Sequence, residues 1–215
     1  MVDRIGTEHS DQRADSRRNR LRLVSAAREL VAERGVDVTA AEIAARAEVG
    51  VGTLYRRFGS KDALIRDILA DGIDEAETVA TAALAEPDAW TGLSMFVSFF
   101  SMIQVANQGI AEYVASATSI PEDMRDYHGH LRTLTQELVA RAHRDGSLRA
   151  DITWEDVVIL CRSSVGAGEC LGVRATPAQW ERTSAIMLEG MRAHDAAPLR
   201  GTPPVNMFAD DASPK

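Results

Sequence analysis

A hydroxyl, a phenol and a guanidinium occur within four consecutive residues, at Thr53, Tyr55 and Arg56. These groups form hydrogen bonds, and the guanidinium adds a positive charge. Both properties suit contact with the base edges and phosphates of duplex DNA. The three groups can act together if one short helix presents them on its outer side.

Residues 39–61 predict two short helices joined by a tight turn. Thr39 followed three residues later by Glu42 is a capping-box pattern, which predicts the start of the first helix. Gly50 can adopt a positive φ at little cost, so we expect it to form the corner between the helices. The second helix is predicted to begin near Val51 and to end at Gly59.

Residues 51–61 read Val-Gly-Thr-Leu-Tyr-Arg-Arg-Phe-Gly-Ser-Lys and closely resemble the recognition helix of TetR-family transcriptional regulators. The resemblance extends over about residues 19–69 and implies a helix-turn-helix whose second helix enters the major groove. We expect Thr39 and Lys61 to hold phosphates on either side of that helix, and Gly52 to let the backbone approach a phosphate. Spacing alone also allows a helical hairpin with a solvated polar face. The predicted DNA-binding residues are Thr39, Gly50, Val51, Gly52, Thr53, Tyr55, Arg56, Arg57, Lys61, Arg17, Arg18 and Arg20.

Three of these arginines, at 17, 18 and 20, belong to a basic cluster that precedes the motif. Residues 1–14 are polar and lack periodicity, so we predict a disordered arm there. The first helix is predicted from Asp15 or Ser16 to Glu33, and the helix-turn-helix domain over residues 15–60. A solvated charge run is the alternative, but a flexible arm at this place is suited to reach the minor groove or the DNA backbone.

The charge distribution supports this organisation. The 215 residues carry a net charge of −8, but residues 1–66 hold 13 basic and 10 acidic residues (+3), and residues 67–215 hold 11 and 22 (−11). DNA repels the acidic part, which leaves the basic part as the contact surface. No apolar run approaches the roughly 20 residues of a membrane helix, and the N-terminus lacks the apolar core of a signal peptide. We therefore expect a cytoplasmic protein.

The remaining pattern predicts an all-α fold of about nine helices, in which a long helix joins the three-helix head to a C-terminal bundle. This helix should run from residue 61 to about 85, within a ligand-binding and dimerisation bundle over 61–195. Further helices are predicted over about 90–105, 110–117, 122–144, 154–165 and 177–194, with a disordered tail over 196–215. Because the long helix is continuous between the two parts, tilting its far end should move the recognition helix.

No metal site or cofactor is predicted. His128 and His130 are two residues apart, a spacing that does not place both on one helical face. Cys161 and Cys170, if they lie on one helix, face opposite sides, so an intrachain disulfide is not expected and two small buried side chains are favoured. The sequence lacks His-x-x-x-His, Glu-x-x-His and Gly-x-Ser-x-Gly patterns, so an all-helical enzyme is the disfavoured alternative.

The bundle is predicted to do two things, partly because similar proteins do them. Its middle helices should surround a mostly apolar pocket for a small molecule. Candidate lining residues, each of which singly suits an ordinary core, are Phe96, Phe99, Phe100, Ile103, Tyr113, Met124, Tyr127, His128 and Trp154. Its last two helices should pair with a second copy, with Gly166, Gly168 and Gly172 in or just after the penultimate helix; the alternative is that this helix ends near Gly166. Candidate interface residues are Cys161, Val165, Gly168, Trp180, Met187 and Met191.

The sequence thus predicts a homodimeric repressor that binds a palindromic operator and releases it when a small molecule occupies the bundle. An activator of the same fold is the alternative. The sequence does not identify the ligand, the operator, the regulated genes or which of Arg56 and Arg57 reads a base.

Overall fold

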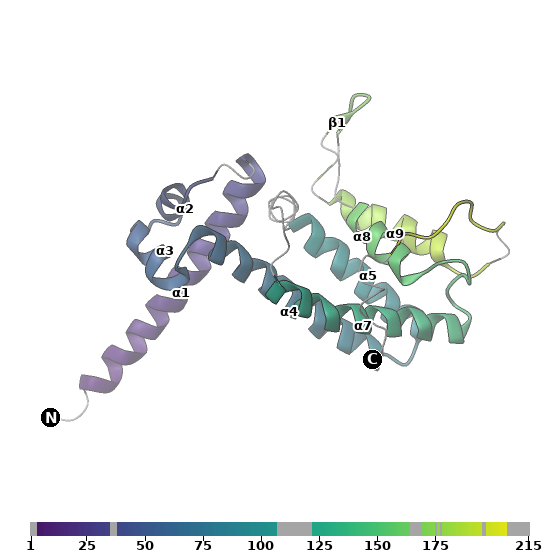
Figure 1. Cartoon of the computed structure of the whole chain (residues 1–215), viewed down its shortest axis with the longest axis horizontal. Coiled ribbons are helices and arrows are strands. Elements are labelled where there is room, and N and C mark those ends of the chain that lie inside the picture. The colour runs from purple at the N-terminus through teal and green to yellow at the C-terminus, as the bar shows by residue number, and fades with distance from the viewer. Residues whose placement is uncertain are drawn as a thin grey trace. The chain divides into compact units, whose positions relative to one another are not determined.

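The structure is a computed structural model that describes residues 4–34, 38–106, 122–163, 169–174, 176, 178–194 and 197–205. This part of the chain contains eight α-helices and one short antiparallel hairpin, which confirms the predicted all-α class (Figure 1). The chain forms two compact units. The described part of unit 1 ends at Asp71, and unit 2 begins at Gly72. This boundary lies inside the long helix α4 (Lys61–Ala85), whereas the sequence placed the domain boundary at residue 60.

Helix α1 runs from Arg4 to Arg34. The predicted disordered arm is therefore wrong for residues 4–14, and so is the predicted helix start at Asp15 or Ser16. Adding a residue to an existing helix fixes one residue per new hydrogen bond, which is far less unfavourable than nucleating a helix.

Helix α2 (Ala40–Arg46) begins with the predicted capping box. The backbone N–H of Glu42 donates to Thr39 Oγ1 at 3.3 Å, and the backbone N–H of Thr39 donates to Glu42 Oε2 at 2.8 Å. Both donors would otherwise lack a partner at the helix end, so the two bonds fix where α2 starts. Arg34 extends the network by donating to Glu42 Oε1 at 2.7 Å.

The corner after α2 differs from the prediction. The residue with a positive φ is Glu48, at 55°, whereas Gly50 has an extended backbone with φ −67° and ψ 141° and caps helix α3 (Val51–Phe58). The N–H of Val49 donates to the carbonyl of Ala44 at 3.0 Å, and that of Glu48 to Ala45 at 3.1 Å. These two bonds define a Schellman motif, which satisfies the last carbonyls of α2 and turns the chain.

Unit 1 has a core to which α1, α2, α3 and the first part of α4 all contribute. Its members include side chains with at most 4% of their surface exposed: Leu23, Ala27, Leu30, Val31, Ile43, Leu54, Leu64, Ile65 and Ile68. Leu54 is the α3 residue among them, and Phe58 packs against the same core from the end of α3. Together they fix which side of α3 faces outward.

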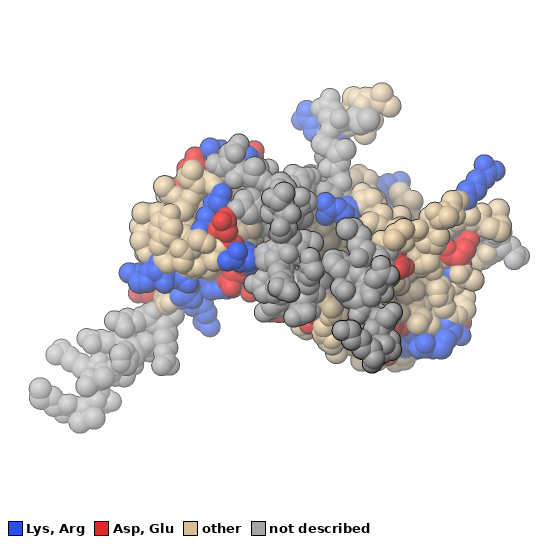
Figure 2. Space-filling model, viewed as in Figure 1, with Lys and Arg blue, Asp and Glu red and all other residues tan. Residues whose placement is uncertain are grey.

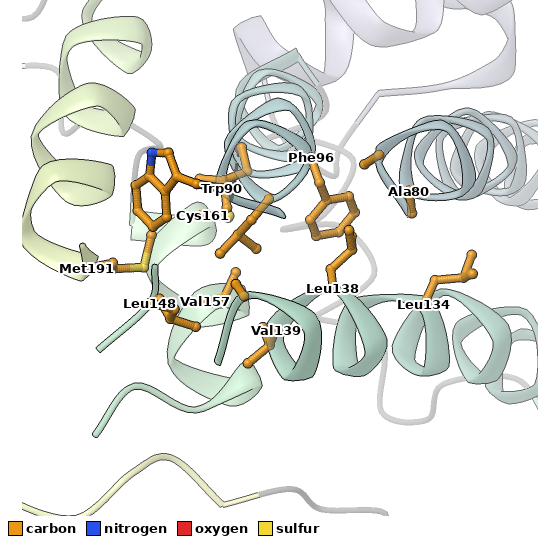
Figure 3. Packing of buried hydrophobic residues seen from close by; sticks show 14 of the residues in the cluster. Ala80, Trp90, Phe96, Leu134, Leu138, Val139, Leu148, Val157, Cys161 and Met191 are labelled. Carbon is orange, nitrogen blue, oxygen red and sulfur yellow. Dashed lines mark hydrogen bonds between the residues drawn. The ribbon is translucent and has the colours of Figure 1, made fainter. Parts of the chain in front are cut away.

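Unit 2 is built around α5 (Ala89–Ala106). This helix contacts α7 (Glu122–Asp145), α8 (Trp154–Ser163) and α9 (Gln179–Met191). The predicted helices over these four segments are confirmed with small shifts at their ends, and the helix predicted over 110–117 lies outside the described residues. In Figure 3, Phe96 of α5 lies over Leu138 of α7, and the sulfur of Met191 lies beside the ring of Trp90.

The C-terminal end of α4 is held closely by its neighbours in unit 2. Arg141 of α7 donates to the carbonyl of Leu84 at 2.8 Å and of Pro87 at 2.9 Å, and it also contacts the carbonyls of Ala83 and Glu86. Helix carbonyls at a C-terminus lack partners within the helix, so this guanidinium caps α4. On α5, Gly92 lies so close that an added Cβ would stand 2.3 Å from the Ala83 oxygen.

The segment between α8 and α9 contains a hairpin that the sequence did not predict. Strand β1 (Glu169–Cys170) pairs with β2 (Val173–Arg174), and both turn residues, Leu171 and Gly172, have positive φ. That turn geometry matches the twist of a two-residue hairpin. Helix α8 ends at Ser163, which agrees better with the alternative of a helix ending near Gly166. Cys161 and Cys170 therefore do not share a helix, and Cys161 is a free, buried thiol.

Part of the predicted disordered tail is tied to unit 2. Arg149 and Asp151 form a two-pronged ion pair, with Nε–Oδ1 at 2.9 Å and Nη2–Oδ2 at 2.8 Å. Arg149 also donates to the carbonyl of Ala197 at 3.0 Å, and the N–H of Leu199 donates to Asp151 at 2.8 Å. The guanidinium and this amide hold the pKa of Asp151 well below its usual value. The prediction of a loose tail is thus wrong for residues 197–199.

Helix α5 is long and apolar enough to pass a length-and-composition test for a membrane span. In unit 2 it packs Leu93, Phe96 and Val97 into the core, with no exposed surface on any of the three. Core helices of water-soluble proteins pass the same test.

Candidate nucleic-acid interface

The outer side of α3 presents the polar groups that the sequence singled out. Leu54 is fully buried, whereas Tyr55 is 52% exposed and Val51 is 42% exposed. Arg56 and Arg57 are exposed, and Thr53 is half-buried. The predicted orientation of this helix is therefore confirmed: its apolar side anchors it in unit 1, and a phenol and two guanidinium groups remain on the outside.

A cleft of about 380 Å³ separates α3 from α1. Its lining residues are Asp15, Ser16, Asn19, Thr53, Arg56 and Arg57. Arg57 crosses it to donate to the hydroxyl of Ser16. The three α1 residues were missed as site residues, although their spacing of three and four positions places them on one side of a helix. Figure 2 shows basic side chains grouped over the part of unit 1 formed by α1 and α3.

Thr39 and Lys61 lie at one edge of α2 and not on either side of α3. The ammonium of Lys61 donates to the carbonyl of Val38 at 2.9 Å, one residue before Thr39. Thr39 is exposed, and its hydroxyl donates to Glu42. Hydrogen bonds from the Thr39 backbone and hydroxyl, together with Arg34, lower the pKa of Glu42 to about 2. Thr39 and Lys61 therefore lie together beside the start of α2, where Thr39 stabilises the first turn of the helix.

The three arginines predicted on α1 separate into two groups. Arg17 and Arg18 are exposed, and Arg18 makes a loose pair with Asp15 at 3.4 Å. Arg20 instead donates to Asp67 at 2.7 Å and to Asp71 at 2.8 Å, both on α4, with 27% of its side chain exposed. These hydrogen bonds raise the pKa of Arg20, and the bond to Asp71 contributes most. Two carboxylates neutralise its charge, so Arg20 joins α1 to α4 and is not a proposed DNA contact.

Some of the predicted ligand-binding residues lie in the core of unit 2, and the side chains of the others are not described by the structure. Phe96 is fully buried, and its ring stacks on that of Phe100 with centroids 5.4 Å apart. Phe99, Phe100, Ile103 and Trp154 pack partly buried against the same core. The side chains of Met124, Tyr127 and His128 are not described, and Tyr113 lies outside the described residues. The described set therefore forms the hydrophobic interior of unit 2.

Two predicted dimer residues are corrected. Cys161 is fully buried beside the Val97 carbonyl, and Met191 is 2% exposed, so both belong to the core and not to an interface. Burial also raises the pKa of the Cys161 thiol to about 11. Trp180 and Met187 are half-buried, while Val165 and Gly168 lie outside the described residues.

Sequence reasoning missed the apolar residues that are exposed on these helices. Ile159 of α8 is 51% exposed, and Ile186 of α9 is 62% exposed. The apolar residues of α8 and α9 occur on both sides of each helix, so periodicity alone did not separate the core side from the outer side.

Comparison with known proteins identifies the class. Residues 23–68 match the family described as "Bacterial regulatory proteins, tetR family". Residues 86–193 match the "Transcriptional regulator SbtR-like, C-terminal domain". The two matches define a DNA-binding transcription regulator with a helix-turn-helix and a helical C-terminal domain. The chain belongs to the TetR family. No curated protein matches it.

Solved structures agree with this family. A TetR transcription regulatory protein from Mycobacterium vanbaalenii is 27% identical, with a TM-score of 0.59, and the match covers 85% of this chain and 99% of that one. TetR transcriptional regulator SCO0520 from Streptomyces coelicolor is 26% identical, with a TM-score of 0.55, covering 80% and 98%. The ketosteroid transcriptional regulator KstR2 of Mycobacterium tuberculosis shares the fold, with a TM-score of 0.59 and 22% identity. The match covers 81% of this chain and 95% of that one.

Proposed function

We propose that this chain is a ligand-responsive repressor that binds a palindromic operator as a homodimer. In this proposal α3 enters the major groove of the operator, and the protein dissociates from the DNA when a small molecule occupies unit 2. The observation that carries the proposal is the anchoring of α3: Leu54 is fully buried while Tyr55, on the next position, is 52% exposed. A rigidly held helix with an exposed phenol and guanidinium groups is the element that reads a groove in helix-turn-helix proteins.

The DNA contacts proposed on this basis are the outer residues of α3 with its N-cap, the two residues beside the start of α2, and the exposed arginines of α1. They comprise Gly50, Val51, Gly52, Thr53, Tyr55, Arg56, Arg57, Thr39, Lys61, Arg17 and Arg18. An added Cβ at Gly52 would meet nothing within 4 Å, which is consistent with open space for a phosphate.

The test is binding to DNA from the region upstream of the chain's own gene, or to sites selected from a random DNA pool. We expect Tyr55→Ala to lower specific affinity at least tenfold, because an exposed phenol contributes to the DNA contact and not to the core. Tyr55→Phe, which removes only the hydroxyl, should have a DNA affinity between those of the wild type and Tyr55→Ala. The melting temperature and the oligomeric state should stay unchanged. Wild-type affinity in Tyr55→Ala would refute the groove placement.

A small-molecule effector is proposed because unit 2 combines an apolar interior with unpaired polar groups. Among the described residues, the buried hydroxyl oxygens of Ser94 and Ser184 have no hydrogen-bond partner, and a buried unpaired hydroxyl is unfavourable unless a partner is supplied. A coupling of about 1–3 kcal/mol between effector and operator would change DNA affinity roughly 5- to 150-fold. Compounds that raise the melting temperature should therefore also weaken operator binding.

An activator of the same fold is the second candidate. A footprint that overlaps the promoter would support repression, whereas a footprint upstream of the promoter would support activation.

A further inference from the structure

We infer that the two adjacent arginines of α3 have different tasks: Arg56 reads a base, whereas Arg57 is held by α1 and contacts the DNA backbone. This division rests on the proposed operator binding through α3. It concerns which residue sets the sequence preference, a question that the Arg-Arg pair at 56–57 leaves open in the sequence.

The helix geometry distinguishes the two positions. Successive residues of an α-helix are rotated by about 100°. Leu54 is fully buried and Phe58 packs against the core, and these two residues, four apart, define the inward direction of α3. Arg56 lies midway between them in the sequence, so it projects about 180° away from the core, whereas Arg57 projects only about 80° away, along the flank of the helix.

That flank is the side on which α1 lies. The cleft between the helices is lined by Thr53 and Arg57 from α3 and by Ser16 and Asn19 from α1. Arg57 spans it through its hydrogen bond to Ser16 Oγ. Arg56 also borders the cleft, but among the described residues no hydrogen bond or ion pair holds its side chain.

The shape of the DNA groove then assigns the tasks. When a helix lies in the major groove, the side chain that points directly away from the protein core meets the base edges, and side chains on the flanks face the sugar–phosphate walls. An unrestrained guanidinium at the outermost position can turn its fork toward the O6 and N7 of a guanine. A guanidinium already bonded to Ser16 keeps its remaining N–H groups directed along the flank, which suits a phosphate.

The experiment compares binding sites selected from a random DNA pool by the full-length wild type and matched variants. Arg56→Gln should change the preferred base from guanine to adenine at one position of each half-site. It should also lower affinity for the wild-type site about 5- to 150-fold per half-site. Arg57→Gln should leave the selected sequence unchanged, weaken binding to all sequences alike, and reduce the salt slope of log K by about 1 per subunit.

Charge-preserving variants sharpen the comparison. Arg56→Lys keeps the charge but loses the bidentate fork, so we expect a relaxed base preference with an unchanged salt slope. Arg57→Lys should retain both the sequence preference and most of the affinity. Arg144→Gln removes an exposed arginine from unit 2 and serves as the control for net charge. Melting temperatures check that every variant is folded.

A changed consensus in Arg57→Gln, or a uniform loss of affinity in Arg56→Gln, would overturn the assignment. A wild type that selects no sequence at all would instead overturn the proposed operator binding, and the division of tasks with it.

Discussion

At the scale of single residues, the helix-turn-helix corner depends on Glu48. Its φ of 55° closes the Schellman motif that ends α2, although a non-glycine residue in this conformation is disfavoured by roughly 1–2 kcal/mol. The neighbouring Gly50, which the sequence suggested for this purpose, has an ordinary extended backbone. The corner is therefore formed against a local preference, and the surrounding core of unit 1 must supply the difference.

The positive φ of Glu48 predicts how substitutions at this position change the free energy of unfolding. Glu48→Gly should raise the free energy of unfolding by about 0.5–1 kcal/mol, because glycine adopts positive φ without a steric penalty but gains more entropy when unfolded. Glu48→Ala removes the same charge without relieving the backbone, so its stability should stay within about 0.5 kcal/mol of the wild type. Urea unfolding of the three proteins measures both differences. Equal stability of the glycine and alanine variants would show that the backbone is not strained at this position.

Motif residues were predictable from the sequence where the interaction is local. The capping box of Thr39 and Glu42 spans three residues, and the outward orientation of Tyr55 follows from helix periodicity. Arg20 was misread because its partners, Asp67 and Asp71, are distant in sequence. A basic cluster looks the same in the sequence whether its charges face DNA or face carboxylates of another helix.

At the scale of helices, the packing at the junction between α4 and α5 leaves no room for a larger side chain. The backbone of α5 approaches the Ala83 carbonyl at Gly92, and Arg141 covers the neighbouring carbonyls. A side chain at position 92 cannot be accommodated unless the two helices separate. The sequence places a glycine here without revealing its neighbour, since Ala83 is in another helix.

Two glycine substitutions in unit 2 test this close approach. Gly92→Ala should destabilise the protein by about 1–3 kcal/mol, the usual effect of overpacking. Gly129→Ala, in α7, has nothing within 4 Å of the added Cβ and should stabilise by about 0.5–1 kcal/mol. Denaturant unfolding followed by circular dichroism measures both changes. If the two variants gained stability alike, the close packing of α5 against α4 at Gly92 would be refuted.

Helix positions in unit 2 were largely predictable from apolar periodicity and from breaks such as residues 86–88. The sequence did not predict which side of α8 and of α9 faces the core. Cys161 and Met191 are core residues, whereas Ile159 and Ile186 are exposed, and all four belong to helices with apolar residues on more than one side. The hairpin between α8 and α9 was missed because each strand has two residues, too few to show a period.

At the scale of the whole molecule, residues 1–66 carry a net charge of +3 and residues 67–215 a net charge of −11, so DNA attracts the first part of the chain and repels the second. One helix-turn-helix reads only a few base pairs, so in the proposed homodimer the second copy would supply the rest of the operator specificity. Because Ile159 and Ile186 are exposed apolar residues, we propose the outer sides of α8 and α9 as the pairing surface.

Charge placed on that surface should separate the copies. We expect Ile186→Glu to be a monomer by light scattering and to lose about 100-fold or more in operator affinity, because the second half-site no longer binds at a high effective concentration. Val205→Glu introduces the same charge at a residue that is 87% exposed and outside the helices, and should remain dimeric. A dimeric Ile186→Glu protein would exclude this face of α9.

The anchoring of residues 197–199 on Arg149 and Asp151 has a practical consequence for anyone shortening or labelling this protein. An affinity tag joined after Val205 leaves both bonds in place. Truncation before Ala197 would deprive Asp151 of an amide donor and Arg149 of a carbonyl acceptor, so a trimmed variant made to improve crystal growth should keep at least the backbone of Leu199.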